Sequence, residues 1–377
     1  MIVYAFILLL FVIQIISFIF IKDCVINVVI FKKKYLRMSK KRFIKILFLS
    51  FDFMLLLLLA VIRDETVGTD YNTYITIFKS FLDLDYDNIT DNYYVSKGEF
   101  LFVVLGYLIK LIFNDYIYMV LVAYLIILLL TYRFILKYSN ELLLSGFLFF
   151  SFSFYNMSLN ILRQYIAAAI VLKSIDYIDK SFKKFFLCLL VGMAFHKTAI
   201  LFIVVYPVLK FVKDIRVSCV CLLLISGVIA LLSEQFVHII GDVANYGTKY
   251  TTMGSEAEID LKIFINALLF LAFFCYSKQF QSKDINANKW IAMSAITLGL
   301  NFSAVFFHYI NRTFLYFMIP EVVAIPNFIK TFDSKIIRYT LELMVVVIFS
   351  IYYLYLVSNT TCYDTVPYTS NMLNLGM

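Results

Sequence analysis

The chain has 377 residues, of which 63% are hydrophobic and only 15% charged, whereas a soluble domain has roughly 25% charged residues. This composition excludes an ordinary soluble globular protein and indicates a chain that lies largely within a membrane. The net charge of +8 is gathered in short clusters along the chain, which argues against nucleic-acid binding.

The basic clusters predict the orientation of the chain in the membrane. Each cluster lies at the end of an apolar segment, as the positive-inside rule expects of cytoplasmic loops, where the side chains would also contact anionic lipid headgroups. The main clusters are Lys32, Lys33, Lys34, Arg37, Lys40, Lys41 and Arg42; Lys180, Lys183 and Lys184; Lys210, Lys213 and Arg216; and Lys330, Lys335 and Arg338.

At least eight apolar segments reach the roughly 17 to 25 residues that cross a bilayer. The first, Ile2 to Ile21, has no basic residue before it and no small-residue cleavage site after it, so we interpret it as a retained helix rather than a signal peptide. It runs inward, and a second helix over 43–62 runs back out. Residues 63–97 are therefore expected outside the cytoplasm.

Two apolar segments follow, at 99–113 and 116–136. If both crossed the membrane, every later basic cluster would lie outside, against the positive-inside rule. The first is short and carries Lys110, so we expect it to be a partly inserted helix that does not cross. A helix over 142–157 then runs out, and one over 160–178 runs back in.

The interval 185–212 has basic clusters at both ends but is too short for two full spans. It predicts a hairpin of half-helices that breaks near residues 194–197, as is tolerated only where the break is buried in protein or lines a wet cavity. A helix over 217–233 leads to a second outer loop, 234–260. Further helices are expected at 261–277, 290–309, 313–330 and 337–357, before a tail from Ser358 that lies outside.

The expected fold is therefore all-α: one polytopic membrane bundle over 1–377, with about 10 to 13 helices including partly inserted ones. Charged residues gather at the expected outer ends of these helices. An ionisable residue in or beside a span is costly, by about 2.5 to 3.5 kcal/mol at a helix centre, so it usually faces a cavity or a partner. The residues concerned are Arg63, Asp64, Asp70, Arg163, His196, Lys197, His308 and Arg312.

These residues predict a shared polar site, although each one alone is also compatible with a side chain that reaches the membrane surface. Arginine forks match phosphate oxygens, and histidine can accept or donate a proton near neutral pH. His308 and Arg312 are four residues apart, which would favour a shared anion. The sequence contains no P-loop, no Rossmann glycine pattern and no metal-ligand spacing among its six cysteines. A lipid diphosphate that needs no nucleotide and no metal fits this set.

Four short blocks, in this order, resemble the EpsG/Wzy-type polysaccharide polymerases of bacterial O-antigen, capsule and exopolysaccharide assembly. The resemblance covers most of the chain and coincides with the residues already singled out. The blocks are Arg63-x4-Gly68-Thr69-Asp70-Tyr71-x2-Tyr74, Leu162-Arg163-Gln164-x2-Ala167, Phe195-His196-Lys197-Thr198-Ala199 and Arg312-x3-Tyr316-Phe317.

The resemblance implies a GT-C-like glycosyltransferase at the outer face of the bacterial plasma (inner) membrane. It would transfer a growing glycan from undecaprenyl diphosphate to an undecaprenyl-diphosphate-linked repeat unit, with no cofactor. Its partners would be these two lipid-linked substrates, membrane lipids and, as a possible partner, a chain-length regulator protein, with no nucleic acid.

The resemblance also implies roles for individual residues. Arg163 and Arg312, with Arg63 as a third candidate, would hold the diphosphate and stabilise its charge. Either His196 or Asp70 would orient or deprotonate the acceptor hydroxyl, and the sequence leaves this choice open. The other expected substrate-binding residues are Gly68, which would permit a tight turn, and Tyr71, Tyr74, Gln164, Lys197, Tyr250 and His308.

Two other function classes remain open from the sequence. A flippase or transporter of a lipid-linked or anionic solute would favour charges at mid-bilayer depth and two related halves, and no repeat is visible in the sequence. A membrane O-acyltransferase of surface glycans would favour a cytoplasmic histidine, whereas His196 is expected near the outer face.

Overall fold

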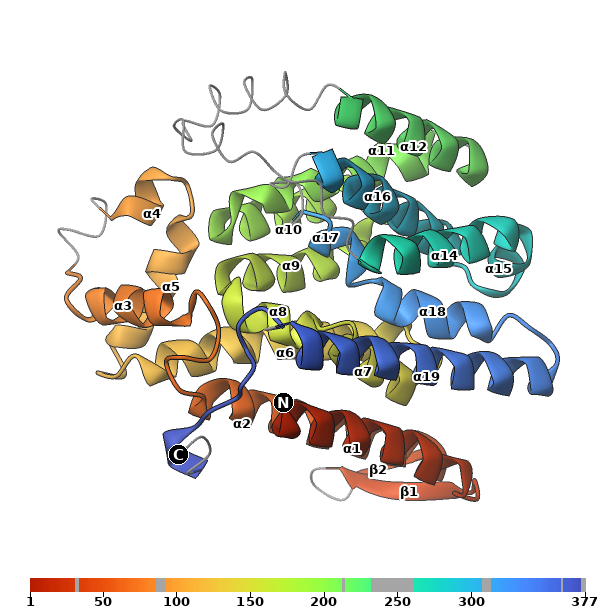
Figure 1. Ribbon diagram of the computed structural model, residues 1–377, viewed down its shortest axis with the longest axis horizontal. Helices are drawn as coiled ribbons and strands as arrows, with labels where there is room; N and C mark the ends of the chain where they lie inside the picture. Colours follow the sequence, from red (N-terminus) through yellow and green to blue (C-terminus); the bar gives the residue numbers. More distant parts are fainter. Residues whose placement is uncertain are drawn as a thin grey trace.

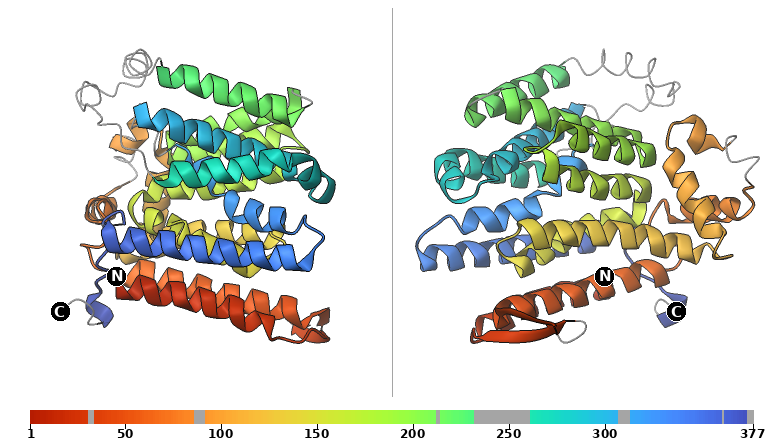
Figure 2. Two further views of the ribbon diagram at one scale, coloured as in Figure 1. Left: turned by 45° about the vertical axis from the view of Figure 1, so that its right-hand side comes forward. Right: turned by 180° about the vertical axis from the view of Figure 1, so that it is seen from behind.

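A computed structural model describes residues 1–30, 34–85, 92–211, 214–231, 261–306, 313–360 and 362–373. The described chain is an all-α bundle with one small β-hairpin, in which the long helices run side by side in parallel or antiparallel directions (Figures 1 and 2). The predicted polytopic membrane fold is confirmed.

Four helices in the described residues are long and apolar enough to cross a membrane: α1 (Ile2–Ile19), α2 (Lys40–Ile62), α6 (Ile117–Tyr138) and α19 (Lys335–Asn359). Two bent helix pairs raise this number to six if each forms one span. They are α7 (Leu142–Ser151) with α8 (Phe154–Asn160), bent by 49°, and α14 (Leu261–Cys275) with α15 (Ser277–Lys283), bent by 72°. Within the described residues this is fewer than the at least eight spanning segments expected from hydropathy, because several apolar stretches there fold as shorter helices.

The remaining elements are mostly short. They are β1 (Val25–Ile30), β2 (Lys34–Ser39), α3 (Tyr71–Leu82), α4 (Tyr93–Ser96), α5 (Phe100–Lys110), α9 (Leu162–Ser174), η2 (Ile175–Tyr177), α10 (Phe182–Phe195), η3 (Lys197–Val204), α11 (Val205–Phe211), α12 (Ile215–Leu231), α16 (Ala287–Phe306), α17 (Leu315–Met318), α18 (Glu321–Ile329) and η6 (Asn371–Leu373). The expected outer loop 63–97 thus contains two helices, α3 and α4, and the loop 234–260 lies outside the described residues.

The hairpin β1–β2 connects the first two long helices along the chain, in a segment expected from the sequence to be only a basic loop. Its strands pair antiparallel from Val25 opposite Ser39 to Ile30 opposite Lys34. The first strand is rich in valine and isoleucine, the β-branched residues that strands prefer. Of the basic residues of this segment, Lys34 and Arg37 therefore belong to strand β2, and Lys40, Lys41 and Arg42 begin α2.

Helix α5 does not cross the bundle. It has 11 residues, about 16 Å at 1.5 Å per residue, which is about half the thickness of a bilayer core. The residue before it, Glu99, contacts Arg163, and Tyr116, shortly after it, lines a hollow together with Arg63. Both ends of this segment therefore lie at the same end of the bundle, as predicted for a helix that does not span.

The predicted break in the interval 185–212 is confirmed. Helix α10 ends at Phe195, and His196 has extended backbone angles before the chain turns into η3. The two arms pack against each other along their length, with the rings of Phe182 and Tyr206 4.7 Å apart and those of Phe185 and Phe202 6.4 Å apart. The hairpin therefore presents His196 at its tip.

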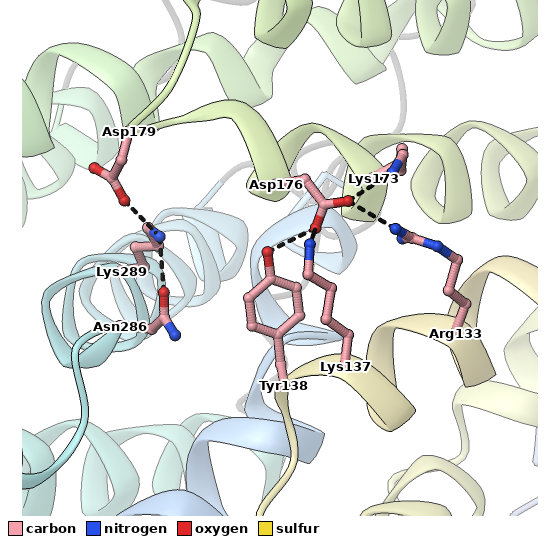
Figure 3. Close-up of polar contacts among 8 residues, drawn as sticks. All are labelled: Arg133, Lys137, Tyr138, Lys173, Asp176, Asp179, Asn286 and Lys289. Carbon is pink, nitrogen blue, oxygen red and sulfur yellow. Dashed lines mark hydrogen bonds and ion pairs between the residues drawn. The ribbon is translucent and has the colours of Figure 1, made fainter. Parts of the chain in front are cut away.

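Polar residues gather at the two opposite ends of the bundle. We call one of them the basic end. There the buried Asp176 carboxylate forms ion pairs with Arg133, Lys137 and Lys173, at N–O distances of 2.9, 2.5 and 2.6 Å (Figure 3). Burial alone raises the pKa of Asp176, but hydrogen bonds from these cations and Tyr138 outweigh it and leave the pKa well below its usual range.

The other end, which we call the site end, holds the residues singled out from the sequence. Helix α9 carries Arg163 in its first turn and Lys173 in its last, and α6 begins next to Tyr116 and carries Arg133 and Lys137 near its other terminus. Each of these two helices therefore has one terminus at each end of the bundle. Helices α3, α4 and α5 also lie at the site end (Figure 1).

Candidate functional site

The centre of the site end is a buried carboxylate that the sequence analysis did not single out. Glu99 is 5% exposed, and its carboxylate forms an ion pair with the guanidinium of Arg163. Its Oε1 lies 2.9 Å from Nδ1 of His196 and accepts a hydrogen bond of 3.3 Å from the backbone N–H of Lys197. Glu99 therefore joins Arg163 to His196 and Lys197, from two separate sequence blocks.

Each member of this cluster lies where a helix begins or ends. Arg163 is the second residue of α9, directly after the break at Ile161. His196 lies at the break between α10 and η3. Glu99 precedes α5 and follows Gly98, whose φ of +77° favours glycine. Because these three residues lie at the ends of different helices, their side chains can converge on one point.

Aromatic rings enclose Arg163. Its guanidinium carbon lies 4.3 Å from the ring centre of Tyr94 and 5.7 Å from that of Phe102, both within the range of cation–π attraction. Arg163 also donates a hydrogen bond to the hydroxyl oxygen of Tyr74. The Arg163 side chain nevertheless remains 22% exposed, so the cluster stays open to a ligand.

The cluster holds Glu99 ionised. Burial by itself raises the pKa of Glu99, but the His196 hydrogen bond and the charge of Arg163 outweigh this effect and leave the pKa below its ordinary value. At neutral pH the carboxylate is therefore a fixed negative charge, which orients His196 and Arg163 from one side.

The third and fourth sequence blocks meet beside this cluster. The hydroxyl of Tyr316 lies 2.9 Å from Oγ1 of Thr198, and the ring of Phe317 stacks on Phe202 at 5.3 Å. Gln164 is buried in the first turn of α9. Arg312, His308 and Tyr250, three residues with predicted roles, lie outside the described residues.

Arg63, the third candidate for holding the diphosphate, is surrounded by aromatic rings and a backbone carbonyl. It is 5% exposed, and its Nη1 donates a hydrogen bond of 2.8 Å to the carbonyl of Leu159, at the end of α8. Its guanidinium carbon lies 3.7 Å from the ring centre of Tyr71 and 5.5 Å from that of Tyr124. These contacts hold the α8–α9 break, so Arg63 shapes the site that Arg163 occupies.

Gly68 permits the turn that was predicted for it. Its φ is +103°, and a Cβ built on it would lie 2.7 Å from Oδ1 of Asn160 and 3.2 Å from the carbonyl of Leu159. The turn leads into α3, with Asp70 half-buried just before the helix and its N–H 3.4 Å from Oδ1 of Asn160.

Replacing Gly68 by alanine is expected to destabilise the protein by about 1 to 3 kcal/mol, because the new Cβ combines a strained backbone with a clash against the α8–α9 break. The measurement is thermal unfolding of the purified variant. Gly227→Ala is the control, since nothing lies within 4 Å of the corresponding Cβ. Equal melting temperatures for both variants would contradict the account of this turn.

The C-terminal segment fastens the first sequence block. Asp364 accepts hydrogen bonds from the Gly68 N–H and the Thr69 hydroxyl, both at 2.7 Å. The Asp64 N–H donates to the carbonyl of Thr369 at 3.1 Å. The sequence predicts no role for this tail, whereas in the structure its backbone holds the turn that precedes α3.

Among the predicted site residues, the structure brings together Arg163, His196 and Lys197, with Gln164 beside them. Tyr74 connects this group to α3. Tyr71, in the same helix, stacks on Arg63, and Gly68, before the helix, lies against Leu159, which also binds Arg63. A signal for Glu99 does exist in the sequence: a carboxylate after a glycine, at the mouth of an apolar segment. Residues 63–74 likewise place carboxylates at the mouth of an apolar segment.

Comparison with known proteins gives one match. The model of the EpsG family matches residues 45–370, which is most of the chain and includes the C-terminal segment through Ser370. No curated protein and no solved structure matches the chain. The predicted likeness to GT-C-like glycosyltransferases therefore stays a prediction.

Proposed function

The chain belongs to the EpsG family, and from this premise we propose that it is a polysaccharide polymerase acting on lipid-linked glycans. It would transfer a growing glycan from undecaprenyl diphosphate to an undecaprenyl-diphosphate-linked repeat unit. Family membership supports a polymerase-type function in general. The donor and acceptor are proposed from the chemistry of the site end.

The observation that carries the proposal is the contact of Glu99 with both Arg163 and His196. Arg163 offers a planar set of N–H donors that match phosphate oxygens, and the exposed side chain of Lys197 adds a second positive charge. Both charges would neutralise a diphosphate as it leaves. A good leaving group makes transfer feasible without a nucleotide.

The proton of the acceptor hydroxyl is proposed to go to His196. Glu99 lies 2.9 Å from Nδ1, which favours a proton on that nitrogen and leaves Nε2 as the acceptor. The hydroxyl oxygen forms a bond to the anomeric carbon, and the bond from that carbon to the diphosphate oxygen breaks. The electron pair leaves with the undecaprenyl diphosphate, beside Arg163.

Asp70 is the other candidate base from the sequence. It lies at the start of α3, one turn before Tyr74, and its charge acts on the Tyr74 hydroxyl. The Glu99 contact favours His196 over Asp70, because a paired histidine is held in one orientation.

The proposed orientation places the basic end in the cytoplasm and the site end outside, following the positive-inside rule. Asn72 is exposed at the site end, and Lys283, at the basic end, has a half-exposed side chain. In a cysteine-free background, an impermeant thiol reagent added to intact cells should modify Asn72→Cys and spare Lys283→Cys. The reverse pattern would reject this orientation.

The direct test is incubation of the purified protein with a defined undecaprenyl-diphosphate oligosaccharide. We expect products longer by whole repeats, without any nucleotide sugar, when the reaction is followed by mass spectrometry. A protein that moves the same lipid across vesicle membranes without lengthening it would instead be a flippase. Transfer of an acyl group would indicate an O-acyltransferase.

A further inference from the structure

A hollow of about 250 Å³ lies at the site end, beside the Glu99 cluster. The start of the first sequence block, helix α3, the segment that leads into α6 and the C-terminal segment together form its walls. Its polar lining residues are Arg63, Asp64, Glu65, Tyr71, Tyr116 and Asn371, and the rest of the lining is aliphatic or methionine.

The charge of this hollow is unlike that of the Glu99 cluster. Asp64 and Glu65 bring two carboxylates, whereas Arg63 is buried, stacked on Tyr71 and bound to Leu159 through Nη1. The side that a ligand meets is therefore more acidic than basic. A diphosphate would be repelled here, while it would be attracted to Arg163 and Lys197.

The same lining suits a sugar ring. Carboxylate oxygens accept hydrogen bonds from hydroxyl groups, and an asparagine side chain both donates and accepts. The half-buried ring of Tyr116, which has Nζ of Lys79 5.2 Å from its centre, adds an aromatic surface. The volume lies below the roughly 300 to 1,000 Å³ of sites for drug-sized ligands. Such a space accommodates one monosaccharide ring, and the rest of the acceptor glycan would extend outside it.

We infer that this hollow binds one uncharged sugar ring of the acceptor repeat unit. The inference rests on the proposed function, because the proposed transfer places an acceptor glycan beside a diphosphate site. Arg63 serves as a positioning residue that holds Tyr71 against the hollow, and it is not a ligand for the donor phosphates.

The position of the hollow fits that role. Tyr71 lines it, and Tyr74, three residues further along α3, hydrogen-bonds Arg163. Three residues of helix rise about 4.5 Å. The acceptor sugar and the donor diphosphate would thus lie about one turn apart along one face of α3, with Asp70 at the start of that turn.

The test fills the hollow without removing a buried charge. Asn371→Trp places an indole at an exposed position of the lining and keeps the backbone N–H that donates to Asp64 at 2.8 Å. Asn72→Trp, on the exposed face of α3 and outside the lining, is the matched control. Both full-length variants are purified in a detergent without a sugar headgroup.

Binding is measured with two kinds of probe. Methyl glycosides of glucose, galactose, N-acetylglucosamine and N-acetylgalactosamine are tested by saturation-transfer NMR, with methyl glucuronide as an anionic comparison. Inorganic pyrophosphate is followed by broadening of its phosphorus resonance. We expect at least one uncharged glycoside to bind the wild type and Asn72→Trp, and to bind Asn371→Trp at least tenfold more weakly, with unchanged pyrophosphate broadening.

Other results would overturn the inference. Lack of saturation transfer to every uncharged glycoside, or stronger transfer to the glucuronide, would reject an uncharged sugar as the ligand. Loss of pyrophosphate broadening in Asn371→Trp would make the hollow part of the diphosphate site. The proposed function fails separately, if Arg163→Ala retains both pyrophosphate binding and glycan elongation.

Discussion

Replacement of Arg163 by alanine is expected to reduce glycan elongation by about 100-fold or more, the cost of removing one preorganised donor to a developing negative charge. Single repeats on the carrier lipid should accumulate. Arg163 is the described arginine that combines partial exposure with a contact to the Glu99 and His196 pair. Arg163→Lys should also fail if the planar fork matters, because lysine keeps only the charge.

The control is Arg133→Ala at the basic end. Arg133 also pairs with a buried carboxylate, at 2.9 Å from Asp176, but Asp176 keeps Lys137 and Lys173 when Arg133 is lost (Figure 3). Near-normal polymer ladders are therefore expected for Arg133→Ala. Equal losses in both variants would show that removal of any ion pair impairs the protein.

A second control separates catalysis from folding. Arg163→Ala alone strands the buried Glu99 carboxylate, and breaking a buried pair in this way costs about 3 to 5 kcal/mol. The double variant Glu99→Gln/Arg163→Ala removes that stranded charge. It should recover thermal stability but not elongation, and recovery of normal ladders would remove Arg163 from the reaction.

Features that depend on the length of apolar segments and on the positions of basic clusters were predictable from the sequence. The break at His196 followed from an apolar interval too short for two spans, and the non-crossing α5 followed from the sides on which later basic clusters must lie. Both inferences use one-dimensional quantities. The described residues hold fewer long spans than hydropathy predicts, since hydropathy alone does not reveal that an apolar stretch such as that of α12 folds as a shorter helix.

Pairings between distant segments were not predictable in this way. Glu99 and Arg163 are 64 residues apart, and their contact depends on how α5 packs against α10, which in turn packs against α9. The C-terminal segment holds Gly68 through a backbone carbonyl, which any residue type supplies. Arg63 shows a third limit: its charge indicated a polar site, but its stacking on Tyr71 appears only in three dimensions.

Replacement of Glu99 by glutamine should lower the elongation rate by about 10- to 100-fold, the usual cost of losing a partner that orients a functional side chain. Because Glu99 acts through His196 and Arg163 rather than on the substrate, kcat should fall more than KM rises. Steady-state kinetics with a defined lipid-linked repeat measures both. A rise in KM alone would instead make Glu99 a substrate-binding residue.

The pH dependence of stability provides an independent check. The pKa of Glu99 lies below its ordinary value of 4.5, so the ionised pair stabilises the fold at neutral pH and this stability is lost as the pH falls through the lower, folded value. The melting-temperature advantage of the wild type over Glu99→Gln should therefore shrink on acidification from pH 7 to below 4.5. Glu141 is the matched control, because Lys45 and Lys330 hold it at the basic end and its pKa is also lowered. Glu141→Gln should show the same loss of acid-sensitive stability but near-normal elongation. If both variants elongate glycans equally well, the reaction does not depend on the Glu99 contact.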